Sequence, residues 1–83
     1  MPRFYLHLYN DLGAVPDEEG EVLADLDDAR ERALKAIRDI LSEEAKQGRI
    51  DLRGRIEISG DDRRPLAVVP FAEAIELHLD QGS

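Results

Sequence analysis

Two tyrosines and a histidine alternate with apolar residues near the start of the chain, in the segment PRFYLHLYND. Tyr5, His7 and Tyr9 occupy every second position, so in a β-strand all three side chains lie on one face of the sheet. An imidazole between two phenol rings could act as an acid or base, bind a metal ion, or belong to a recognition surface. We interpret Tyr5, His7 and Tyr9 as a candidate interaction face.

His7 lacks the companions that metal binding or catalysis requires. The second histidine, His78, lies far along the chain, and neither belongs to an HxxxH or HxxE arrangement. The segment NDLGAVPDEEGE fails as a calcium loop, because aligning Gly20 with the required glycine places Val15 and Leu26 at the terminal ligand positions. Cysteine, a GxSxG motif and a glycine-rich phosphate loop are all absent from the sequence. We expect no catalytic, metal or cofactor residues; a small-ligand or metal-dependent enzyme using His7 is a minor alternative.

Charge is distributed unevenly along the chain, whose 83 residues carry a formal net charge of −8. The segment from Asn10 to Asp28 contains eight acidic residues and no basic one, whereas basic residues predominate from Lys46 to Arg64. A negative balance repels phosphate backbones and anionic lipids, so we expect neither nucleic acid nor a membrane as partner. The charged groups that could meet between two copies are Asp17, Glu18, Glu19, Arg49, Arg53 and Arg55.

The length of the chain limits it to one small core. We expect a single domain over residues 1–83, with residues 80–83 as a flexible tail. A core of this size supplies only about 3–5 kcal/mol of stability, so association with a second copy would help to stabilise the fold. No signal peptide or window of roughly 18 apolar residues is present, and a cytoplasmic location is the default expectation.

A long helix is the clearest element that could position these residues. Apolar residues recur at helical spacing in DLDDARERALKAIRDILSEEAKQG, which predicts a helix from Leu26 to Gln47. Asp25 suits the N-cap, and Gly48 suits the left-handed position after the last turn. At 1.5 Å per residue the helix would be about 33 Å long. We therefore expect its last turns to extend beyond the sheet, where a partner chain could bind.

Three strands are predicted, at residues 3–9, 55–59 and 66–69, from alternating or short aliphatic runs. Residues 10–21 are interpreted as a turn and an ordered loop with a short strand at Ala14 and Val15, and the tail PFAEAIELHLD as a short helix, although it also alternates. The expected fold is α+β: a small three-stranded, mainly antiparallel sheet against one long helix, in the order β-α-β-β-α. We place the third strand between the first two, because a returning helix would make those two parallel.

Several segments together resemble a known family. They are RFYLHL, the D-x-E-G motif at Asp17, Glu19 and Gly20, the helix LDDARERALKAIRDIL, and the strands GRIEIS and LAVVPF. In this order they resemble a family of small bacterial domains of unknown function, over nearly the whole chain. Where such sequences often read D-x-x-G-R, this chain has Asp61-Asp62-Arg63-Arg64, so we expect a different turn geometry. The resemblance implies the fold and carries no activity or site residues.

The leading functional hypothesis is a non-enzymatic interaction domain that self-associates as a homodimer. Either the face of Tyr5, His7 and Tyr9 or a sheet edge would form the contact, and the acidic segment of one chain could meet the arginines of the other. The alternative is an acidic adaptor or antitoxin-like regulator that binds a basic protein partner. Its basis is a looser likeness of architecture to HicB-type antitoxins, together with the acidic segment, which could steer such a partner into place.

Overall fold

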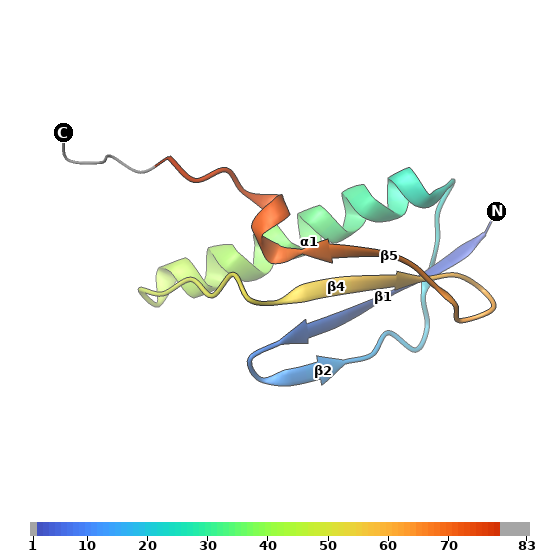
Figure 1. The fold of residues 1–83 in the computed structure, drawn as a ribbon, viewed down its shortest axis with the longest axis horizontal. Helices are drawn as coiled ribbons and strands as arrows, with labels where there is room; N and C mark the ends of the chain where they lie inside the picture. The colour runs from blue at the N-terminus through green and yellow to red at the C-terminus, as the bar shows by residue number, and fades with distance from the viewer. Residues whose placement is uncertain (1, 79–83) are drawn as a thin grey trace.

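The computed structural model describes residues 2–78. In it, an antiparallel sheet of five strands, one of them very short, lies against a single long helix (Figure 1). This arrangement confirms the α+β class. The elements, in chain order, are β1 (Arg3–Asn10), β2 (Gly13–Val15), β3 (Glu21–Val22), α1 (Leu26–Lys46), β4 (Arg55–Ser59), β5 (Pro65–Pro70) and the 3-10 helix η1 (Phe71–Ala74).

Helix α1 begins and ends where its sequence signals predict. The Asp25 carboxylate accepts a hydrogen bond of 2.9 Å from the backbone N–H of Asp28, which satisfies one of the free donors of the first turn. The helix ends at Lys46, one residue before the predicted end, and Gly48 follows with a φ of +89°. Its last turns extend beyond the strands, as expected (Figure 1).

The order of the strands differs from the prediction. The sheet runs β2-β1-β4-β5, so the strand at residues 55–59 occupies the centre, and the predicted order with β5 beside β1 is wrong. The reason is that β2 folds back along β1, and β3 then pairs with the start of β1 through Arg3 and Phe4. The chain has therefore returned to the start of β1 before α1 begins. The next strand, β4, runs antiparallel to β1 and can pair with it directly.

The core lies between α1 and one face of the sheet. Phe4, Leu6 and Leu8 of β1 face the helix, as their alternation predicts. Ile58 in the central strand and Ile37 at the middle of the helix are fully buried. The remaining buried apolar residues are Ala29, Ala33, Leu41, Ile56, Val69, Phe71 and Ala74. One layer of helix thus covers one face of the sheet, and no helix among residues 2–78 covers the other face.

The predicted C-terminal helix is present as the single turn η1, and residues 75–78 form neither helix nor strand. A hydrogen bond of 2.7 Å from Arg38 Nε to the carbonyl oxygen of Ala74 ties this turn to α1. The tail predicted at residues 80–83 lies outside the described residues. In the part of the chain that the structure describes, no helix is both long and apolar enough to cross a membrane.

Candidate functional site

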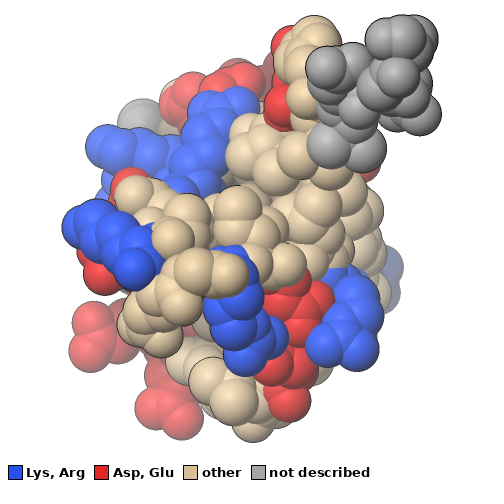
Figure 2. Space-filling model, turned by 90° about the vertical axis from the view of Figure 1, so that its left-hand side faces the viewer, with Lys and Arg blue, Asp and Glu red and all other residues tan. Residues whose placement is uncertain are grey.

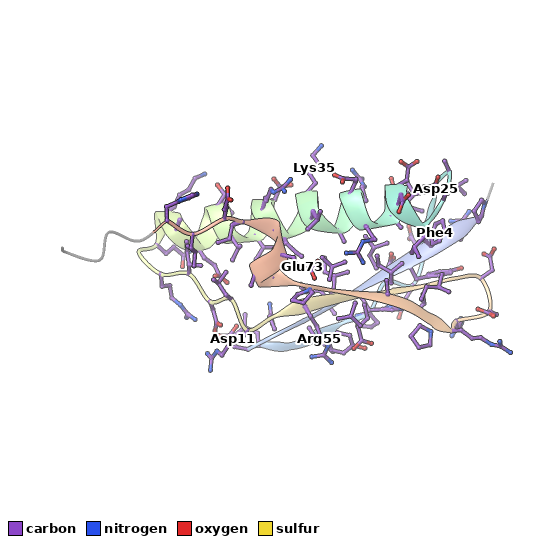
Figure 3. All side chains as sticks on the ribbon, turned by 45° about the horizontal axis from the view of Figure 1, so that its top comes forward. Phe4, Asp11, Asp25, Lys35, Arg55 and Glu73 are labelled. Atoms are coloured by element: carbon purple, nitrogen blue, oxygen red, sulfur yellow. The ribbon has the colours of Figure 1, made fainter. Side chains whose placement is uncertain are left out.

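The face of the sheet that lies away from α1 carries the predicted interaction residues. We call it the open face and define it by Tyr5, His7, Tyr9, Arg55, Glu57, Ser59 and Val68. The antiparallel register places Tyr5 opposite Ser59, His7 opposite Glu57, and Tyr9 opposite Arg55, and directly paired residues share a face. Val68 is opposite Glu57 on the other side of β4, and Leu66 lies two residues before it, at the bulge where the register of β5 on β4 shifts. In Figure 3, the Arg55 side chain projects from the side of the sheet opposite to α1.

The open face combines rings, aliphatic side chains and one ion pair. The Tyr5 and His7 rings are almost parallel, with 6.5 Å between their centroids. The Arg55 guanidinium lies 4.4 Å from the centroid of the Tyr9 ring, and its Nε is 2.9 Å from Glu57 Oε2. Leu66 and Val68 are 47% and 46% exposed. The structure thus extends the candidate face of Tyr5, His7 and Tyr9 across two more strands.

Asp17 fills a gap along the outer edge of β1. Strand β2 pairs with Leu8–Asn10 and β3 with Arg3 and Phe4, which leaves Leu6 without a strand partner on that side. The Asp17 carboxylate accepts hydrogen bonds from the backbone N–H groups of Leu6 (3.1 Å) and Gly20 (3.0 Å). Its own N–H donates to Nδ1 of His7 at 3.0 Å. Asp17 therefore holds the segment between β2 and β3 against β1.

Replacing Asp17 with alanine is expected to lower the free energy of unfolding by about 2–3 kcal/mol, because two backbone N–H groups lose a charged acceptor. Asp17→Asn keeps the shape and one acceptor oxygen, and we expect a loss of about 1 kcal/mol. Urea unfolding followed by circular dichroism measures both values. An alanine variant as stable as the wild type would show that this carboxylate does not hold the segment.

The other predicted charged residues lie in two places. Glu18 and Glu19 are exposed beside Asp17, and the Glu19 carbonyl oxygen accepts a hydrogen bond of 2.8 Å from Arg3. The three arginines lie between the end of α1 and the first residue of β4. Figure 2, which looks at the side of the molecule that is on the left in Figure 1, shows basic and acidic side chains adjoining one another. Arg49 is 3.4 Å from Asp11, Arg49 and Arg53 are 3.5 and 2.7 Å from Asp51, and Arg55 contacts Glu57. Each arginine thus has an acidic partner in its own chain.

The Arg53–Asp51 pair has a marked effect on ionisation. Side-chain and backbone hydrogen bonds from Arg53 hold the pKa of Asp51 well below its usual range, and the pair raises the pKa of Arg53. Because folding lowers the pKa of Asp51, any stabilisation from this pair is present at neutral pH and disappears as the pH falls through the lowered value. The exposed position of Arg53 makes that stabilisation small.

A hollow lies at one end of the open face, with a volume of about 470 Å³. It is lined by Tyr5, His7, Pro16, Asp17, Glu18, Ser59 and Arg63. Sequence reasoning missed Ser59 and Arg63. The sequence held one signal for Arg63, because the turn at residues 61–64 lacks the glycine that similar sequences often have there. Arg63 has a φ of +64°, in the left-handed region that costs a residue with a side chain about 1 kcal/mol.

The donor atoms of the site give little support to a metal centre. Within residues 2–78, no group of three or more His, Asp or Glu side chains is placed to share one metal ion. Nδ1 of His7 accepts the Asp17 N–H, so Nε2 is the ring nitrogen that remains for another group. The arrangement can offer hydrogen bonds, rings and apolar contacts to a binding partner.

Comparison with known proteins gives a family and no activity. A family model described as a domain of unknown function, DUF6894, matches residues 3–72, which include every strand and α1. Comparisons with curated proteins and with solved structures found no significant match. Since the match covers most of the 83 residues, the chain belongs to the DUF6894 family of domains of unknown function.

Proposed function

We propose that this protein is a non-enzymatic interaction domain that forms a homodimer through the open face. The observation that carries the proposal is the exposed aliphatic residue Val68, with the exposed Leu66 near it at the bulge of β5, on the same face as the rings of Tyr5, His7 and Tyr9. Aromatic and aliphatic side chains gathered on one face supply the apolar area on which association depends.

A second copy suits this face because its charges are self-complementary. Arg55 and Glu57 lie two residues apart on β4, with Arg55 Nε 2.9 Å from Glu57 Oε2. When a twofold axis passes through a contact, each pair of residues that meet across it occurs twice, with the two copies exchanging roles. Arg55 of one copy can then meet Glu57 of the second while the aliphatic residues and rings exclude water. Neither charge is buried without an opposite charge nearby.

The sheet edges are poorer candidates for the contact. Edge strand β5 has Pro65 and Pro70 at its two ends, and proline has no N–H to donate to an added strand. The opposite edge strand, β2, has only three residues, Gly13–Val15. Short or proline-bounded edges are common ways of preventing strand addition. These features favour contact through the open face over extension of the sheet.

The test is a pair of lysine substitutions, one on each side of the sheet. Val68→Lys would place a charge inside the proposed contact, and we expect a rise of about 100-fold in the dimer dissociation constant, or about 3 kcal/mol. Val15→Lys is the matched control, because Val15 is also an exposed strand valine, at 58%, but pairs with Leu8 and so lies on the helix side.

Sedimentation equilibrium over a range of concentrations measures the dissociation constants. Equal constants for wild type and Val68→Lys would contradict the proposed interface, provided that circular dichroism shows both proteins folded. Weakening by Val15→Lys alone would place the contact at the β2 edge. A monomeric wild type at about 100 µM would exclude all but very weak self-association.

An acidic adaptor for a basic protein partner is the second candidate function. The observation that favours it is the net charge of −8 and the exposure of Glu18, Glu19, Asp27 and Asp28, which make no ion pair within residues 2–78. Such a complex would form faster at low salt and weaken steeply as salt rises. A monomeric wild type that binds a basic protein with this salt dependence would favour the adaptor over the homodimer.

A further inference from the structure

Arg63 is one of two basic residues whose side chains have no partner within residues 2–78, and of these two it alone lines the hollow. Nine of the eleven Lys and Arg side chains contact a carboxylate or carbonyl oxygen within the described residues, and only Lys35 and Arg63 do not. Arg64, the next residue, is 3.3 Å from Asp62. A guanidinium with five donors and no acceptor is therefore free at the rim of the hollow.

The backbone at Arg63 is also strained. Its φ of +64° is the only positive value at a described residue other than glycine, and its N–H donates to the Gly60 carbonyl oxygen at 2.9 Å. Glycine would adopt this conformation without strain. The last residue of a three-residue hairpin loop commonly adopts this conformation. The positive φ therefore belongs to the turn between β4 and β5, and the free guanidinium is the observation that singles out Arg63.

Ser59 supplies a second polar group to the same hollow. The residue is 7% exposed, it lines the hollow, and it lies opposite Tyr5 in the sheet. Its hydroxyl can donate one hydrogen bond and accept two. Nearby, the Nδ1 atom of His7 accepts the Asp17 N–H, so the neutral imidazole carries its proton on Nε2. The hollow thus offers hydrogen-bonding groups beside the nearly parallel Tyr5 and His7 rings.

Negative charge also lines the hollow. Glu18 is among the lining residues and makes no ion pair within the described part of the chain, whereas the Asp17 carboxylate is already bonded to Leu6 and Gly20. A simple anion would be attracted by Arg63 but repelled by Glu18 and by the net charge of −8. A ligand with both signs of charge is complementary to this mixed lining.

We propose that the hollow binds a small zwitterion with a flat ring, of the aromatic amino acid class. Its carboxylate would accept hydrogen bonds from the Arg63 guanidinium and the Ser59 hydroxyl. Its ammonium group would lie towards Glu18, and its ring would contact Tyr5 and His7. The volume of about 470 Å³ is within the range of small-molecule sites. This inference does not rest on the homodimer; because Tyr5, His7 and Ser59 belong to both the open face and the hollow, the ligand and a second copy would compete for them.

Three small molecules that share a phenyl ring on a short chain, but differ in their charged groups, test which ligand the hollow binds. L-phenylalanine carries both charges, 3-phenylpropanoate lacks the ammonium group, and 2-phenylethylamine lacks the carboxylate. In an NMR titration of the wild type, we expect L-phenylalanine to bind about tenfold more tightly than either of the others. The shifting resonances should include those of His7 and Ser59. Absence of binding, or equal affinity for all three probes, would overturn the proposal.

Substitution of Arg63 separates binding from folding. In Arg63→Gly we expect the preference for L-phenylalanine over 2-phenylethylamine to disappear, while Tm rises by about 4 °C because the backbone strain is relieved. Arg64→Gly is the matched control and should retain the preference with a slightly lower Tm. An unchanged preference in Arg63→Gly would contradict the role of its guanidinium.

The same titration with Val68→Lys distinguishes this inference from the homodimer. Val68 is not among the residues that line the hollow. Selective binding of L-phenylalanine by this variant would support the site even if the wild type proves to be a monomer. Loss of binding in a folded Val68→Lys protein would contradict an independent site.

Discussion

Gly20→Ala is expected to lower the free energy of unfolding by about 2–4 kcal/mol, a large part of the stability of so small a domain. Gly20 has a φ of +71°, and an added Cβ would lie 2.8 Å from Cε2 of Tyr5, 2.9 Å from Cγ of Arg3 and 2.9 Å from the carbonyl oxygen of Phe4. The carbonyl belongs to β1 and cannot move without disturbing the sheet. Backbone strain and steric overlap therefore both lower the stability of the Gly20→Ala variant.

Gly48→Ala is the control that isolates the backbone contribution. Gly48 has a φ of +89°, and an added Cβ would have no atom within 4 Å. We expect a loss of about 1 kcal/mol from the left-handed conformation alone. Urea unfolding of both variants measures the difference. Equal losses would contradict the close approach of Gly20 to β1.

Phe71→Ala is expected to lower the free energy of unfolding by about 3–5 kcal/mol, which would leave much of the protein unfolded. Phe71 is among the largest fully buried side chains, and its ring lies over Gly54. A Cβ added to Gly54 would be 2.7 and 2.8 Å from two ring carbons. Because Gly54 has no side chain, the ring fills that space, and alanine at position 71 would leave a cavity in the core.

A milder substitution keeps this prediction measurable if Phe71→Ala does not fold. Phe71→Leu retains most of the apolar volume, and we expect a loss of about 1.5 kcal/mol. Thermal and urea unfolding measure both variants. A loss of less than about 1 kcal/mol for Phe71→Ala would show that η1 contributes little to the core.

The elements with local signals could be predicted from the sequence. The apolar spacing and the capping Asp25 predicted α1 to within one residue of its end. Alternation predicted which side chains of β1 and β4 face the core. These predictions succeed because helix caps and strand alternation depend on neighbouring residues alone. The predicted family resemblance is likewise confirmed by the match over residues 3–72.

The strand order could not be predicted in the same way. It depends on β3, a strand of two residues, Glu21 and Val22, whose sequence carries no strand pattern. The position of β3 is held by the Asp17 carboxylate and by an N–H···O bond of 3.1 Å from Leu23 to Pro2, contacts that link distant parts of the chain. The D-x-E-G motif thus has a structural explanation, because Asp17 and Gly20 together fix this segment on β1.

The candidate site could be predicted only in part. Tyr5, His7 and Tyr9 share a strand, so their common face follows from spacing. Ser59 and Arg63 join them through the pairing of β1 with β4 and the conformation of the following turn. Val68 reaches the same face through the register of β5 on β4. Register between distant strands is set by the whole core and has no local signal.

Contacts between the two copies are the most direct test of the homodimer. Isotope-filtered NMR on a mixture of labelled and unlabelled wild-type protein detects pairs of protons that belong to different chains. We predict that the intermolecular contacts involve the methyl groups of Leu66 and Val68 and the rings of the open face. Contacts confined to the outer surface of α1, where Lys35 projects in Figure 3, or the absence of any intermolecular contact, would contradict the proposed interface.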